Sequence, residues 1–160
     1  MNMEQITLEV LKGYALHHDG THGISHWRRV RDNGLFLAES TGADTEVVEL
    51  FAVFHDCRRL NEGRDPGHGA RGAQLAVEMR GEWFQMDDEP FEHLLMACRA
   101  HTAGLTEAHP TVQTCWDADR LDLGRVGVIP RADRLCTRPA KDPDTIKWAL
   151  ARSQAGWDRH

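Results

Sequence analysis

The sequence lacks the patterns that mark a secreted or membrane-spanning protein. Its four cysteines are scattered and none forms a C-x-x-C pair, which is typical of reduced thiols in a cytosolic protein. The first residues, MNMEQITLEV, do not join a basic segment to an apolar one, so we expect no signal peptide. The apolar run VVELFAVF is interrupted by Glu49 and is far shorter than the ~20 residues that cross a bilayer. We therefore expect a cytoplasmic protein without membrane contact.

Basic residues do not predominate either. The 160 residues include 19 Lys and Arg against 25 Asp and Glu, which gives a formal charge of -6. A protein that binds duplex nucleic acid neutralises many phosphates and is usually basic, so we expect no duplex as a partner. A small anionic substrate is compatible with this charge, because a bound metal and a few arginines can make one pocket positive. The oligomeric state is left open.

Sustained alternation of apolar and polar residues, which marks β-strands, is almost absent, whereas helical periodicity is common. We expect an all-α fold, a helical bundle of about six to eight helices. The predicted helices lie at about 3–17, 21–40, 45–58, 67–80, 88–102, 110–122 and 143–154, with a short one near 130–137. No linker divides the chain, so residues 1–160 are predicted to form a single domain.

Histidine is abundant, with ten residues, and several lie on helix faces that should be buried. His55 continues the apolar row of Val47 and Phe51, and Asp56 follows it directly. Comparable positions on four other predicted helices are held by His26, His68, His101 and Asp119. One buried imidazole or carboxylate is usually satisfied within the core, because burial without a partner is costly. Five helices that each contribute such a residue indicate a shared partner, and a divalent metal suits imidazole and carboxylate ligands.

The tetrapeptide ADRL occurs twice, around Asp119 and around Asp133, but its flanking residues differ and no repeat follows from it. Asp119 lies on the apolar face of a long predicted helix and should point inward. Asp133 lies in a short segment bounded by Pro130 and Pro139, where the dipole of a helix start is reason enough for an acidic residue. We expect Asp119 to bind metal and Asp133 not to.

The order of His26, the doublet His55-Asp56 and a distal aspartate in an all-α chain resembles the HD superfamily of metal-dependent phosphohydrolases, whose signature is H…HD…D. Three segments over roughly residues 20–125 carry the resemblance: HGISHWRRV at 22–30, FHDCRR at 54–59 and DADRLDLG at 117–124. The resemblance implies that His26, His55, Asp56 and Asp119 hold a divalent metal ion. Mn²⁺, Mg²⁺, Fe²⁺, Ni²⁺ and Zn²⁺ all suit such mixed nitrogen and oxygen ligands.

Some members of this superfamily bind a second metal through two further histidines, and His68 and His101 lie in the matching interval. His68 follows Asp56 by only twelve residues, which argues against a second metal. The chain would therefore bind one or two ions. With one ion, we expect His68 and His101 to contact the substrate phosphate or a water on the metal.

The residues after the doublet suggest how a substrate is held. Arg58 and Arg59 stand where some HD nucleotidases carry an acidic residue, and a guanidinium makes bidentate contacts to phosphate. We expect both to bind substrate, the alternative being a solvated turn. Either Asp56 or Glu62 would transfer the proton, and the sequence does not choose between them.

These patterns predict a hydrolase that cleaves a phosphoester or phosphoanhydride of a small molecule, such as a nucleotide, with a water that the metal activates. Two other classes stay open. A dinuclear iron oxygenase of the same fold would contain two irons and consume O₂. A non-catalytic interaction module stabilised by metal would close its metal site to solvent.

Overall fold

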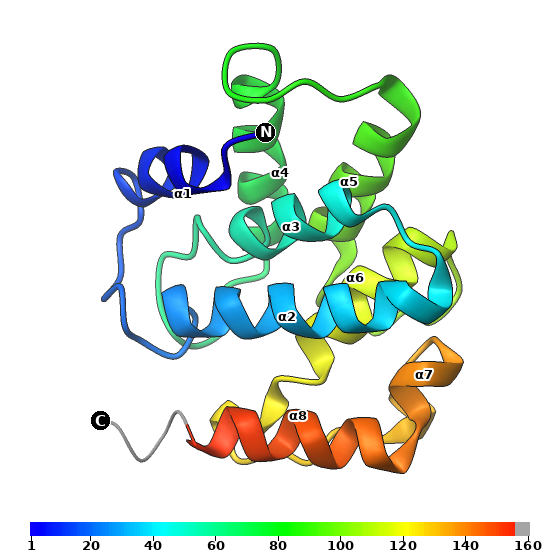
Figure 1. The fold of residues 1–160 in the computed structure, drawn as a ribbon. Helices are drawn as coiled ribbons and strands as arrows, with labels where there is room; N and C mark the ends of the chain where they lie inside the picture. The colour runs from blue at the N-terminus through cyan, green and yellow to red at the C-terminus, as the bar shows by residue number, and fades with distance from the viewer. Residues whose placement is uncertain (156–160) are drawn as a thin grey trace.

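The computed structural model describes residues 1–155, and over this range the chain is helical, with one isolated β-bridge between Arg80 and Phe84 and no strand. Figure 1 shows the arrangement of its eight α-helices. These are α1 (Met3–Leu11), α2 (Ile24–Thr41), α3 (Thr45–Phe54), α4 (His68–Met79), α5 (Asp88–Ala100), α6 (Pro110–Arg120), α7 (Arg138–Lys141) and α8 (Pro143–Ala155), with 3₁₀ turns η1 (Leu123–Val126) and η2 (Ala132–Arg134). The predicted all-α fold is confirmed.

Short polar signals set the ends of the inner helices. Helix α2 stops at Gly42, whose φ of 73° is readily adopted by a residue without a Cβ. The Asp44 carboxylate then accepts hydrogen bonds from the backbone N–H groups of Glu46 and Val47 and starts α3. Pro110 occupies the first turn of α6, where its missing N–H costs nothing.

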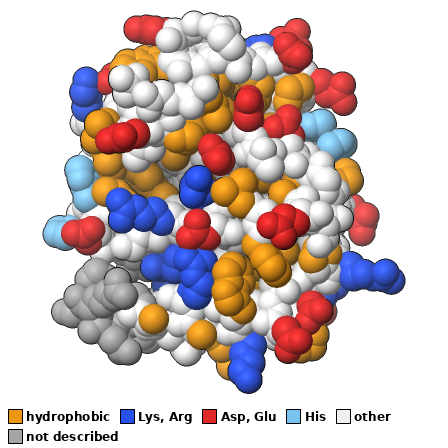
Figure 2. All heavy atoms as spheres, viewed as in Figure 1, with side chains coloured by type: hydrophobic (Ala, Val, Ile, Leu, Met, Phe, Trp, Pro, Cys, Tyr) orange, Lys and Arg blue, Asp and Glu red, His pale blue; other side chains and the backbone are white. Residues whose placement is uncertain are grey.

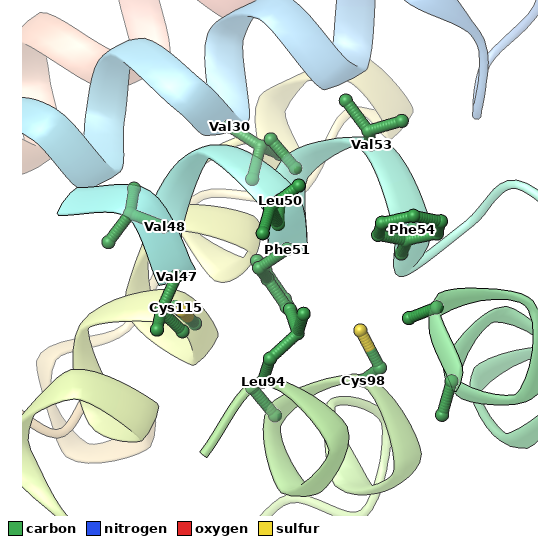
Figure 3. Close-up of a cluster of buried hydrophobic side chains, with 14 of the residues drawn as sticks. Val30, Val47, Val48, Leu50, Phe51, Val53, Phe54, Leu94, Cys98 and Cys115 are labelled. Carbon is green, nitrogen blue, oxygen red and sulfur yellow. The ribbon is translucent and has the colours of Figure 1, made fainter. Parts of the chain in front are cut away.

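Helix α3 forms the centre of the core. It packs against α1, α2, α4, α5 and α6, and every residue from Val47 to Phe54 except Glu49 is buried. Figure 3 shows Phe51 pointing toward Leu94 of α5. A helix that is covered on all sides is apolar on all sides. Because α3 ends inside the core, the polar residues that follow Phe54 are also buried.

Two predicted helices end early or lie elsewhere. Helix α1 stops at Leu11 rather than near residue 17, and the Arg58 guanidinium donates a 3.0 Å hydrogen bond to the Val10 carbonyl that this helix end leaves available. Residues 130–137 form only the turn η2 and extended chain, and the next helix begins at Arg138. The buried Asp117 carboxylate accepts hydrogen bonds from the backbone N–H groups of Cys136 and Thr137, at 2.7 and 2.8 Å, which holds that segment outside a helix.

The last helix supports the turn η1. Helix α8 runs antiparallel to α2, and Arg152 pairs with Asp32 at 2.7 Å (Figure 1). It also packs on η1 at Gly124, where a Cβ would collide with the Ser153 hydroxyl. Because no side chain fits at Gly124, the backbone of η1 lies directly against the Ser153 and Leu150 side chains of α8, and η1 has a fixed position.

The surface and the thiols fit the expectations from composition. On the face shown in Figure 2, acidic and basic side chains are interspersed among exposed apolar ones. Within residues 1–155, no helix is both long enough and apolar enough to cross a bilayer. The four cysteines are unpaired, and burial raises the pKa of the Cys57 thiol to about 12.

Candidate metal centre

Three parts of the chain meet at one group of ligand atoms. His26 lies in the first turn of α2, His55 and Asp56 follow α3, and Asp119 is in the last turn of α6. The His26 Nε2 atom lies 3.1 Å from His55 Nε2, 3.1 Å from Asp119 Oδ1 and 3.2 Å from Asp56 Oδ2. Both imidazoles are fully buried. The structure thus brings the four predicted ligands together in a group that could hold a metal ion.

A second group adjoins the first and shares Asp56 with it. His68, the first residue of α4, and His101, just after α5, place their Nε2 atoms 2.9 Å apart. These atoms lie 3.1 and 3.4 Å from Asp56 Oδ1, whereas Asp56 Oδ2 faces His26. One carboxylate therefore offers one oxygen to each group.

Two glycines allow the second group to form. A Cβ at Gly72 would collide with the Phe54 carbonyl, and a Cβ at Gly69 would collide with the Cys98 carbonyl. Without these side chains α4 approaches both the end of α3 and the end of α5. The short spacing between Asp56 and His68 is therefore no obstacle to a second group, and Arg71 of α4 holds the intervening loop through the Arg58 carbonyl and the Asp65 carboxylate.

The hydrogen bonds of the imidazoles show where their protons are. Backbone carbonyls face the Nδ1 atoms of three histidines: Phe51 O faces His55, Asp65 O faces His68 and Cys98 O faces His101. A carbonyl can only accept, so each Nδ1 donates, and a neutral ring then has a lone pair at Nε2. The lone pairs of these three rings and the Asp56 and Asp119 oxygens converge on the two groups. Such a set of nitrogen and oxygen ligand atoms fits a cation.

The charges of the site also favour a cation. Burial opposes ionisation of Asp56 and Asp119, but the imidazoles around them hold the pKa of both carboxyl groups well below the ordinary value. Burial likewise opposes charge on His26, but its bonds to Asp119, Asp122 and Asp56 raise its pKa to about 9. The metal-free site therefore takes up a proton where a metal ion would otherwise bind.

Metal binding should consequently strengthen as the pH rises. Below about pH 9 a cation must displace the proton of His26, so binding releases protons and its affinity increases from pH 6 to pH 8. The stability that protonated His26 gives the metal-free protein is complete below its unfolded pKa of about 6.5 and is lost as the pH rises through about 9. Calorimetric titration with Mn²⁺ at several pH values, in buffers of different ionisation enthalpy, counts the released protons; a pH-independent affinity without proton release would contradict this assignment.

The sequence analysis missed Asp122. Its buried carboxylate accepts from His26 Nδ1 at 2.6 Å through one oxygen and from Arg29 Nε at 2.7 Å through the other. This bond fixes the His26 ring so that Nε2 faces the ligand group. No local pattern signals this role, because Asp122 lies in the turn between α6 and η1 and not on a helix face.

A pocket of about 310 Å³ opens onto both groups. Its lining includes Asp56, Asp119, His101 and His22, the guanidinium-bearing residues Arg59, Arg120 and Arg125, and the uncharged Thr102, Leu123 and Val126. Arg59 Nε contacts Asp56 Oδ1 at 3.3 Å, and Arg59 Nη1 donates to the Gly63 carbonyl. Arg125, a residue that the sequence analysis missed, donates from Nε to Thr21 O and from Nη1 to Asp122 O. The pocket is therefore positive beside the ligand groups.

Other predicted site residues lie further away. Arg58 is bonded to the Val10 and Cys57 carbonyls and does not line the pocket, so the structure does not place it for the predicted substrate binding. Glu62 is also outside the lining, but its Oε2 lies 3.2 Å from Nδ1 of the pocket residue His22. Asp133 pairs with Arg131 on the surface, at 2.9 Å, away from both ligand groups.

Fold and site together define an all-α protein with two adjoining His/Asp groups that could hold metal. Among solved structures, the chain is similar to a predicted HD superfamily hydrolase from an uncultured Thermotogales bacterium, with a TM-score of 0.68 and 24% sequence identity over 98% of this chain and 88% of that chain. The chain therefore has the HD-domain fold, as its motifs predict. No protein-family model matches it, and no curated protein is detectably similar.

Proposed function

We propose that this protein is a metal-dependent phosphohydrolase that acts on a small phosphorylated molecule. One observation carries the proposal: two adjoining groups of imidazole and carboxylate ligands share Asp56 and open into a pocket lined by arginines. The description of the similar solved structure as a predicted hydrolase supports the same reaction class. The pocket volume, about 310 Å³, lies at the lower end of the range that is usual for small-molecule sites, which favours a small substrate.

The ligand groups assign the residues that would hold metal. His26, His55, Asp56 and Asp119 would bind one divalent ion, and Asp56, His68 and His101 a second. When bound, such an ion lowers the pKa of a coordinated water and offsets charge on a phosphoryl group. Arg59 and Arg125 each donate hydrogen bonds from Nε and Nη1. Within the described residues, the Nη2 atom of each guanidinium has no hydrogen-bond partner. We propose that these Nη2 groups bind the phosphate.

Glu62 is better placed than Asp56 to transfer a proton. Both Asp56 oxygens face ligand histidines, and one also contacts Arg59, so this carboxylate is fully engaged. His22 lines the pocket, and burial lowers its pKa to about 4, so its ring is neutral at pH 7 and would pass a proton on rather than keep it. The partner of His22, Glu62, is 41% exposed and can exchange protons with solvent. We propose that protons pass between the pocket and solvent through His22 and Glu62.

The alternatives fit the site less well. A closed structural metal site is disfavoured, because 15% of the Asp119 side chain is exposed and the pocket opens onto it. The carboxylate shared by two groups is also compatible with a pair of irons, so O₂ consumption by the iron-loaded protein should be measured. The arginines beside the groups favour the hydrolase, since they complement an anion. The unpaired cysteines support a cytoplasmic location, and duplex nucleic acid is not proposed as a partner.

Removing the metal should abolish the activity. The purified protein is assayed for phosphate release on a panel of phosphorylated metabolites, then treated with a chelator, checked by elemental analysis and assayed again. We expect loss of hydrolysis after chelation and recovery with Mn²⁺ or another divalent ion, because the nucleophilic water needs the metal. Hydrolysis that continues in protein shown to be metal-free would overturn the proposal, as would the absence of hydrolysis with every metal tested.

A further inference from the structure

The turn η1 gives the pocket an apolar edge. Leu123 and Val126 both line the pocket. They are three residues apart in a 3₁₀ turn, where side chains at positions i and i+3 lie one above the other on the same face. The two side chains therefore form one continuous strip.

The apolar edge continues out of the pocket. Val126 is 45% exposed, and it is followed by Val128 and Ile129, which are 47% and 63% exposed. Gly127, with a φ of 80°, donates to Gly124 O, and Val128 N donates to Leu123 O at 3.2 Å, so this segment folds back onto η1. Apolar side chains exposed together beside a pocket are typical of a surface that contacts a ligand.

The edge is rigid and carries its own cation. Gly124 is packed against α8, and Arg125 is tied to Thr21 O and Asp122 O. The guanidinium of Arg125 and the side chain of Val126 therefore line the same pocket from one turn whose position is fixed. A ligand that contacts both must carry an anionic group and an apolar group within the span of that turn.

The apolar edge offers no hydrogen-bond partner to a hydroxyl group. Among the described residues that line the pocket, Leu123 and Val126 are the apolar ones, and the side chains that can bind hydroxyl groups belong to the other lining residues. A ligand rich in hydroxyls would leave several of them unpaired against the apolar edge, which costs binding free energy. We propose, resting on the proposed function, that the substrate carries an alkyl or aryl group beside its phosphate, held by Leu123 and Val126, rather than a polyol.

A pair of phosphonates tests this inference without hydrolysis. Butylphosphonate and 3,4-dihydroxybutylphosphonate have the same charge and chain length and differ in two hydroxyl groups. Their dissociation constants for the metal-loaded full-length protein are measured by calorimetry. We expect butylphosphonate to bind roughly 10- to 100-fold more tightly, the discrimination that apolar contacts commonly provide.

Substitution of the apolar edge should remove this preference. Val126→Ser is expected to weaken butylphosphonate binding and leave dihydroxybutylphosphonate binding nearly unchanged. Val77→Ser is the matched control, because Val77 lies on α4 outside the pocket lining. Its exposed fraction, 42%, is similar to the 45% of Val126. Val126→Thr provides a second variant of the same pocket residue if Val126→Ser does not fold, as judged by its melting temperature.

The outcomes separate this inference from the proposed function. If the protein hydrolyses phosphate esters but binds both phosphonates equally, prefers the diol or binds neither, the apolar edge does not select the substrate. If Val77→Ser lowers the preference as much as Val126→Ser does, the effect is not specific to the edge and the inference fails. If no phosphorylated compound is hydrolysed with any metal, the proposed function itself fails, whatever the phosphonates do.

Discussion

Replacing Asp56 by asparagine is expected to remove metal from both ligand groups and abolish hydrolysis. Each group uses one Asp56 oxygen, and an amide supplies no negative charge and only one oxygen. The loss of metal affinity should exceed the ~10–100-fold that a change in an outer partner of a ligand typically costs. Elemental analysis of the purified variant, followed by titration with Mn²⁺, measures the number of ions per chain and their affinity.

The control for this variant is Asp44→Asn. Asp44 caps the start of α3 through a side-chain oxygen, and asparagine caps a helix about as well as aspartate. This change removes the same charge from the same chain away from both groups, so metal content and activity should stay at the wild-type level. An Asp56→Asn variant with full metal content would refute the shared role of Asp56.

The second large effect is expected at one of the two ADRL segments and not at the other. Asp119→Asn should lose the ion of the first group and nearly all activity, because Asp119 Oδ1 lies 3.1 Å from His26 Nε2 and 3.4 Å from His55 Nε2. Asp133→Asn should change neither, because the pair of Asp133 with Arg131 is exposed to solvent. Metal content, activity and melting temperature of both variants are compared.

The number of ions that remain distinguishes the two groups. Asp119 does not belong to the group of Asp56, His68 and His101, so a protein that binds two ions should keep one in Asp119→Asn and none in Asp56→Asn. Loss of metal in Asp133→Asn, with retention in Asp119→Asn, would show that the assignment of the two aspartates is reversed.

The positions of three of the four candidate ligands could be predicted because helices carry them on apolar faces. His26 and Asp119 interrupt such faces, and His55 extends one, so periodicity alone points all three inward. Asp122 and Arg125 follow α6 in turns without a helical period, and their partners, His26 and Thr21, are about a hundred residues away in the sequence. Their roles depend on tertiary contacts that no local pattern contains.

The neighbours Arg58 and Arg59 show the same limit. Both have the chemistry to bind phosphate, and the sequence offers no means to separate them. In the structure the end of α1 presents the Val10 carbonyl to Arg58, whereas Arg59 reaches Asp56. The end of α1, which is distant in the sequence, therefore determines that Arg59 and not Arg58 lines the pocket.

With an ion in each group, the two oxygens of Asp56 would couple the two binding equilibria. An ion held by one oxygen neutralises much of the charge that the other oxygen presents, so the second ion should bind more weakly than the first. Linkage requires this penalty to be reciprocal, the same factor whichever group fills first. Affinities measured for this centre therefore describe the pair, and loading would proceed in steps, with a singly occupied protein as a distinct species over a range of metal concentration.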